Sequence, residues 1–98
     1  MIELKTPNKQ MKLLRKMLDA DGIPWHDDSD FMFCRTHSDE VRTVTRGGKK
    51  EQRRLFSVIC GDCAYGGAEG LECWTCDMED PEGHHSATTA MAAIREVL

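Results

Sequence analysis

The sequence contains few aromatic residues and no long apolar run. Three phenylalanines, two tryptophans and one tyrosine make up 6% of its 98 residues. So small a set offers little for stacking nucleic-acid bases. No apolar run approaches the length of a membrane span, and the first residues lead into a charged segment without the apolar core of a secretory signal. We therefore expect a soluble, cytoplasmic protein that has no membrane partner.

Motifs of common enzyme classes are also absent. The sequence has no G-x-S-x-G elbow, no P-loop and no His-Glu pattern of a metal-dependent hydrolase. Its four histidines, His26, His37, His84 and His85, are scattered along the chain or lie in an expected turn. Because catalysis needs a nucleophile with a base, paired carboxylates or an open metal site, we expect a protein that is not an enzyme.

Composition and charge indicate one folded domain. The sequence is 40% hydrophobic and 31% charged, with a formal net charge of -4, and it shows neither an internal repeat nor a linker. We expect a single domain over residues 1–98, small enough for a metal ion to add useful stability. The acidic balance argues against nucleic acid as the main partner.

Two CxxC pairs are the most specific pattern in the chain. They supply Cys60, Cys63, Cys73 and Cys76, and the segment between them, residues 64–72, contains three glycines that let the chain double back. Four thiolates from two tight turns are typical of a structural zinc site, whose full ligand shell leaves no position for catalysis. The sequence therefore predicts a Zn²⁺ ion at these residues, although iron is also bound by four thiolates and the sequence does not separate the two metals.

Other interpretations of these cysteines stay open. A redox-active CxxC needs its first sulfur at a helix N-terminus, whereas Cys60 follows the apolar run 55–59 and is expected to end a strand. Disulfides need an oxidising compartment, and buried thiols without any metal are also compatible with the pattern. His84 or His85 could replace one thiolate. The fifth cysteine, Cys34, is expected to be a small buried residue of a strand.

Periodicity and turn residues predict an α+β fold. A first helix is expected from a Thr6 cap to Gly22, with the stripe Met11, Leu14 and Leu18 buried, and a second follows a Ser86 cap, with an apolar stripe that extends to Leu98. Strands are expected over residues 23–26, 31–37, 41–46, 55–60 and 71–76, and Gly47-Gly48 indicates a hairpin. Together they predict a small antiparallel β-meander, flanked by an N-terminal and a C-terminal helix, with a zinc-knuckle-like insertion that carries the four cysteines.

Charged residues gather in three places. A basic hairpin is expected to project from the acidic body, and it carries Arg42, Arg46, Lys49, Lys50, Arg53 and Arg54. Acidic side chains gather in a turn after the first helix and again after the second CxxC pair, at Asp27, Asp28 and Asp30 and at Asp77, Glu79 and Asp80.

Several short strings resemble a group of uncharacterised proteins encoded by phages and prophages of gut bacteria. The resemblance covers most of the chain and includes no catalytic motif. It implies an accessory protein of a mobile element rather than a housekeeping enzyme. The strings are residues 6–11, 14–16, 22–30, 35–36, 56–59, 65–67 and 70–72.

From these features we expect a non-enzymatic, zinc-stabilised binding protein of phage type. Its acidic surfaces would occupy the basic surface of a host macromolecule, such as the nucleic-acid channel of a nuclease. Small acidic anti-CRISPR proteins block CRISPR nucleases in this way. The alternative is a zinc-stabilised nucleic-acid-binding module that uses the basic hairpin 42–54, with Trp25, Tyr65 and Trp74 as stacking groups.

Overall fold

The computed structural model describes residues 3–61, 64, 67 and 69–98. It has two helices and seven strands within this part of the chain. In chain order the elements are α1 (Lys9–Ala20), β1 (Trp25–Asp27), β2 (Cys34–Ser38), β3 (Val41–Arg46), β4 (Lys49–Arg54), β5 (Phe56–Cys60), β6 (Leu71–Thr75), β7 (Glu82–His85) and α2 (Ala87–Arg95).

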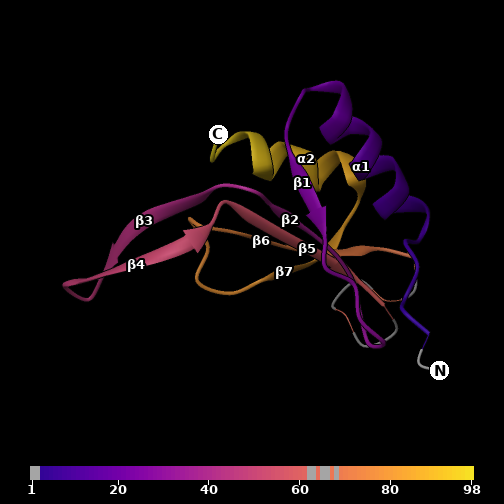
Figure 1. Cartoon of the computed structure of the whole chain (residues 1–98), viewed down its shortest axis with the longest axis horizontal. Coiled ribbons are helices and arrows are strands. Elements are labelled where there is room, and N and C mark those ends of the chain that lie inside the picture. The colour runs from indigo at the N-terminus through magenta and orange to yellow at the C-terminus, as the bar shows by residue number, and fades with distance from the viewer. Residues whose placement is uncertain (1–2, 62–63, 65–66, 68) are drawn as a thin grey trace.

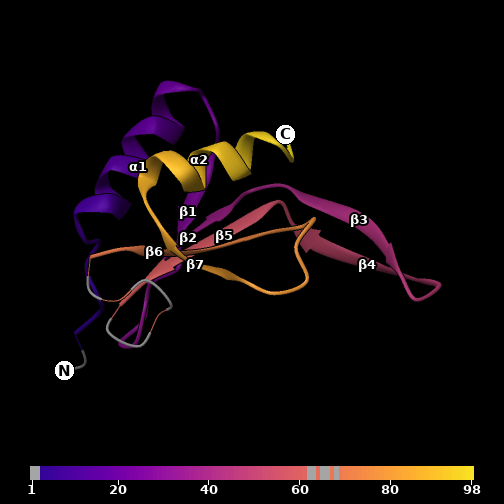
Figure 2. The same ribbon diagram turned by 180° about the vertical axis from the view of Figure 1, so that it is seen from behind.

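Five strands form one antiparallel sheet in the order β1-β2-β5-β6-β7. Burial alternates along β5 and β6, so each strand has one face in the core. Both helices lie on the same side of this sheet (Figures 1 and 2). The predicted α+β class, with two helices and antiparallel strands, is therefore confirmed.

The first helix begins two residues later than expected. Asn8, not Thr6, is the N-cap, because its Oδ1 accepts a hydrogen bond of 2.8 Å from the Met11 amide. The predicted stripe is buried, and Gly22 adopts the left-handed conformation with φ of 69°. The Ile23 amide then donates to Leu18 O at 2.9 Å, which closes a Schellman motif at the C-terminus.

The second helix starts at the predicted cap. The Ser86 hydroxyl and the Thr89 side chain form a reciprocal capping box. The expected stripe does not extend to Leu98, whose side chain is 58% exposed. Because α2 ends at Arg95, the later residues no longer follow the helical period that would turn this leucine inward.

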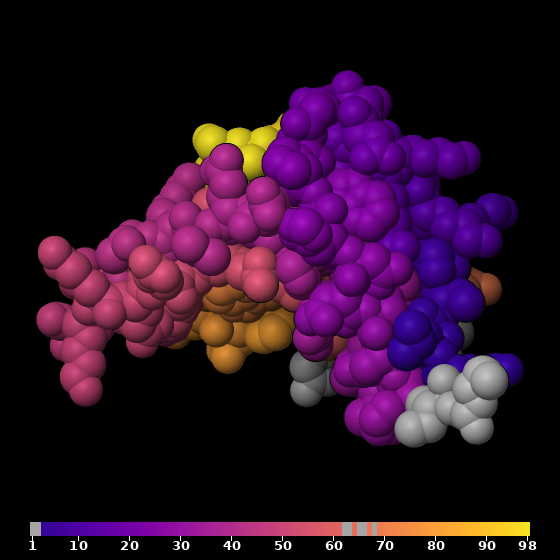
Figure 3. Space-filling view, viewed as in Figure 1, coloured from indigo at the N-terminus to yellow at the C-terminus, as the bar shows by residue number. Residues whose placement is uncertain are grey.

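Strands β3 and β4 form a separate two-stranded sheet, here called the arm (residues 41–54). Gly47 and Gly48 have φ of 56° and 77°, which is the backbone of a type I′ hairpin turn. The predicted projecting hairpin is thus present, but it does not share a meander with the other strands. Figure 3 shows the arm standing out from the body.

One buried hydroxyl closes the base of the arm. Ser38, at the end of β2, is 2% exposed. Its Oγ accepts hydrogen bonds from the amides of Leu55, at 2.8 Å, and Phe56, at 3.4 Å, and donates to Glu40 O at 2.8 Å. The chain therefore leaves the main sheet and returns to it at a single point.

Two further differences from the expected strands concern β2 and β7. Strand β2 starts at Cys34 rather than at residue 31, because Asp30 Oδ1 accepts hydrogen bonds from the amides of Met32 and Phe33, at 2.7 and 2.8 Å, and holds these residues in a turn.

Strand β7 was not expected. Its polar residues, Glu82–His85, show no apolar alternation that would predict a strand.

We expect Ser38→Ala to destabilise the protein by about 1–3 kcal/mol. It removes the buried acceptor that the Leu55 and Phe56 amides share, and it leaves the Leu55 amide only a longer hydrogen bond, of 3.4 Å, to Glu40 O. Urea unfolding followed by circular dichroism measures this change. Thr43→Ala, on the exposed side of the arm, is the matched control and should change stability by less than about 0.5 kcal/mol. Equal stability of both variants would show that the base of the arm does not depend on this hydroxyl.

Candidate functional site

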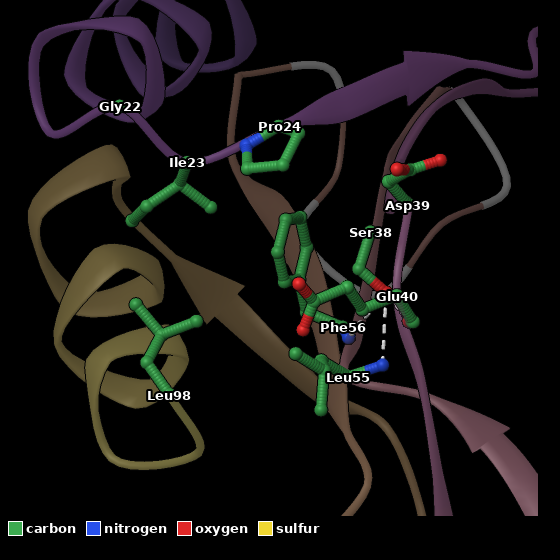
Figure 4. Close-up of a pocket in the computed structure, with 9 residues that line it drawn as sticks. All are labelled: Gly22, Ile23, Pro24, Ser38, Asp39, Glu40, Leu55, Phe56 and Leu98. Atoms are coloured by element: carbon green, nitrogen blue, oxygen red, sulfur yellow. Dashed lines mark hydrogen bonds between the residues drawn. The ribbon is translucent and has the colours of Figure 1, made fainter.

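A pocket opens where the arm joins the body. It has a volume of about 200 Å³ and lies between the end of α1, the end of α2 and the start of β5. Ile23 and Leu98 stand on one side of it, with Leu55 and Phe56 across from them (Figure 4). The walls of this arm-base pocket are therefore apolar.

Two carboxylates follow Ser38 at the mouth of the arm-base pocket, and they point in different directions. Glu40 extends its carboxylate over Phe56 and toward the pocket (Figure 4). The Asp39 carboxylate points away from it, and its Oδ1 lies 2.7 Å from Nε2 of His26. Glu40 is thus the carboxylate that a ligand in the pocket would meet.

The size and chemistry of the arm-base pocket suit one side chain rather than a cofactor. Small-molecule and cofactor sites usually enclose about 300–1,000 Å³. Apolar walls below a carboxylate match a lysine or arginine side chain, whose methylene stem packs on apolar groups while its cationic end pairs with an oxygen anion.

The acidic turn predicted as a partner surface is largely occupied by its own loop. A hydrogen bond from the Ser29 hydroxyl lowers the pKa of Asp27, which also pairs with Arg15 at 3.4 Å. The backbone amides of Phe33 and Met32 lower the pKa of Asp30. Asp28 lies 3.9 Å from Arg35 and stays 65% exposed. These aspartates mainly build the turn.

The second acidic stretch lies elsewhere. Cys76 donates its amide to Leu55 O, at the start of β5, whereas the turn at Asp27 to Asp30 adjoins the end of β5 that carries Cys60. The two acidic stretches therefore sit at opposite ends of the sheet. Of the residues Asp77, Glu79 and Asp80, Glu79 pairs with Arg46 at 2.9 Å.

Most arginines of the predicted basic hairpin contact the protein itself. Arg42 donates to Val97 O and Arg46 pairs with Glu79. Arg53 lies 3.1 Å from Glu51. Arg54 donates to Ser38 O at 2.9 Å. The remaining two basic residues, Lys49 and Lys50, are exposed beside the hairpin turn.

The tryptophans predicted to stack on bases are covered by arginines. Arg15 lies 4.8 Å from the ring of Trp25, and Arg53 lies 5.5 Å from the ring of Trp74. Tyr65 is outside the described residues. Both tryptophans are also partly buried against the hydrophobic core, which disfavours the stacking on bases that single-stranded nucleic acid needs.

Strand register separates the cysteines of the predicted zinc site. Cys60 is five residues along β5 from Leu55, the residue that Cys76 contacts, so the two cysteines are about 16 Å apart along the strand. Cys73 lies between them, opposite Val58, and Cys63 is outside the described residues. Thiolates on one zinc ion lie about 2.3 Å from it, so these three do not fit one site. Within residues 3–61, 64, 67 and 69–98, no three His, Cys, Asp or Glu side chains are grouped as metal ligands.

Cys60 instead faces the fifth cysteine. Cys34, which is buried as predicted, pairs with it across β2 and β5. A hydrogen bond from the Cys60 thiol lowers the pKa of Cys34 to about 6, and the charge of Arg15 adds to this effect. The same hydrogen bond raises the pKa of Cys60. Burial raises the pKa of Cys73 to about 12.

The two neighbouring histidines do not join the cysteines. His85 lies 2.9 Å from Thr89 Oγ1 through Nδ1 and 3.2 Å from Glu82 through Nε2. The arrangement Thr89–His85–Glu82 resembles the nucleophile, base and acid of a catalytic triad. Thr89 Oγ1, however, also accepts a hydrogen bond from the Ser86 amide and so forms part of the helix cap. His84 is exposed, with φ of 60°.

Sequence reasoning missed the residues of the arm-base pocket. Glu40 belongs to none of the motifs or charge clusters described from the sequence, and Leu98 was expected as the last member of a buried stripe. The Arg15 side chain, which is not part of the predicted apolar stripe of α1, is only 13% exposed and contacts β2 through Thr36. No local pattern signals these roles, because each depends on which strand lies opposite.

Comparisons with known proteins give no information about the fold or the site of this chain. No family model, no curated protein and no solved structure matches this chain. The resemblance to phage proteins therefore stays a prediction. In the part of the chain that the structure describes, neither helix is long and apolar enough to cross a membrane.

From the strand register we expect less than one zinc per chain in protein purified without chelator. Elemental analysis of the reduced protein measures this content. One zinc per chain, lost together with thermal stability in the double variant Cys60→Ser, Cys73→Ser, would contradict the register argument and restore the four-cysteine site.

Proposed function

We propose that the protein is a non-enzymatic binding protein that captures a lysine or arginine side chain of a partner protein in the arm-base pocket. The observation that supports this is the placement of the Glu40 carboxylate over apolar walls made by Ile23, Leu55, Phe56 and Leu98. The pocket provides both surfaces that a long basic side chain needs.

The charge distribution supports a protein partner over nucleic acid. Four arginines of the arm are held by contacts within the chain, and the net charge is -4. In the phage-type setting that the resemblance implies, the partner would be a host protein with a basic surface, such as a CRISPR or other nucleic-acid-handling nuclease. Occupying that surface would inhibit or modulate its activity. The acidic residues Asp28 and Glu79, which are 65% and 82% exposed, would add long-range attraction.

Nucleic acid is the second candidate partner, and the two lysines beside the turn of the arm favour it. Lys49 and Lys50 are exposed, and the arm that carries them stands out from the body (Figure 3). Binding through them would fall steeply with salt, because neutralising phosphates releases counterions.

We expect the tripeptide Ala-Lys-Ala, blocked at both ends, to shift the amide NMR signals of Ile23, Glu40 and Phe56. Ala-norleucine-Ala has the same stem without the charge and should bind about threefold more weakly. Glu40→Gln should remove this difference between the peptides. Asp39→Asn changes the net charge equally, but the Asp39 carboxylate points away from the pocket, so this variant should keep the difference. Equal binding of both peptides to the wild type would refute the pocket's role.

The apolar wall and the nucleic-acid alternative are tested in the same system. Leu98→Ala should weaken both peptides, whereas Leu4→Ala, a leucine that is 63% exposed elsewhere, should weaken neither. A double variant, Lys49→Glu and Lys50→Glu, should leave peptide binding unchanged. If it abolishes a salt-dependent affinity for single-stranded DNA in the wild type, the arm is a nucleic-acid interface instead.

A further inference from the structure

The buried thiols of Cys34 and Cys60 lie directly opposite each other in two central strands of the sheet. They are 0% and 2% exposed, and β2 and β5 pair antiparallel around them. Directly opposed residues of an antiparallel pair point to the same face, with Cα atoms about 4.5–5.5 Å apart. That spacing falls within the range of about 4.4–6.8 Å that disulfides require. The two strands therefore hold these cysteines ready to join.

A positive charge adjoins this thiol pair. Arg15 Nη2 lies 3.4 Å from Cys34 Sγ, and Nε of the same guanidinium is fixed by a 2.7 Å hydrogen bond to Thr36 Oγ1. A cysteine that only fills space needs no cation beside its sulfur, whereas a guanidinium stabilises the thiolate, which is the nucleophilic form. Cys34 is thus the attacking thiol and Cys60 the resolving one.

We propose that Cys34 and Cys60 form a thiol–disulfide exchange site whose substrate is a low-molecular-weight disulfide. The Cys34 thiolate attacks one sulfur of that disulfide, and the bond between its two sulfurs breaks to release one thiolate. Cys60 then loses its proton and attacks Cys34 Sγ, which releases the second small thiolate. The cross-strand disulfide gains its bond as the small disulfide is reduced to two thiols.

The loop before β2 lies against the strand end that carries Cys60. A Cβ placed on Gly61, the residue after Cys60, would lie 2.7 Å from Met32 O, so the loop backbone packs directly on the end of β5. Asp30 holds this loop through its two hydrogen bonds to the amides of Met32 and Phe33. Because both thiols are buried, exchange requires this end of the sheet to open locally, and we expect the loop to move in that opening. This site is independent of the arm-base pocket and of the function proposed for it.

Incubation of the reduced protein with glutathione disulfide tests the site. We expect a mass loss of about 2 Da, for the two hydrogens removed, and a melting temperature roughly 10 °C higher. Cleavage by trypsin and by a protease that cuts before aspartate should yield one linked species, residues 30–35 joined to residues 55–61. Because the second cut falls at Asp62, it separates Cys60 from Cys63.

The controls separate this pair from other cysteines. Cys34→Ala should lose both the linked species and the rise in melting temperature, and Cys73→Ala should keep both. Absence of the 30–35 to 55–61 species from the oxidised wild type overturns the proposal without use of any variant. So does the same rise in melting temperature in Cys34→Ala.

The access route has its own test. Asp30→Ala removes the loop's acceptor and should speed disulfide formation severalfold, whereas Asp80→Ala, in a distant acidic turn, should leave the rate unchanged. Equal rates in the two variants would overturn the role of the loop.

Discussion

The hydrogen bonds to the Ser38 hydroxyl are the constraint on which the rest of this architecture depends. They join the end of β2 to the start of β5, which lie 17 and 18 residues apart along the chain. The segment between these two points, residues 41–54, therefore lies outside the main sheet, and its strands β3 and β4 pair with each other. A two-stranded ribbon is only marginally stable alone, and its base must therefore be fixed by the body.

The same junction creates the arm-base pocket. Because the chain turns sharply after Ser38, Glu40 is carried over Phe56, and the end of α2 brings Leu98 to the opposite side. The pocket is thus a consequence of how the arm leaves the sheet. A ligand bound there would contact the body and the base of the arm at once.

Cations in this acidic protein are used mainly to connect its elements. Arg15 links α1 to β2 and covers Trp25, while Arg42 links the arm to the residues after α2. Arg53 covers Trp74. A partly buried guanidinium is stabilising only when its donors are satisfied, and these contacts provide that.

Local sequence patterns alone determined the helices, the hairpin at Gly47-Gly48 and the burial of Cys34, because periodicity, capping groups and glycine conformation act over a few residues. Tertiary structure decided which strands pair. The CxxC spacing indicated one four-thiolate site, yet the antiparallel register carries Cys76 to one end of β5, leaves Cys60 at the other and sets it opposite Cys34. The pocket around Glu40 could not be predicted from the sequence either, since its walls come from segments far apart in the chain. Register and long-range packing depend on all strands together, and no short stretch encodes them.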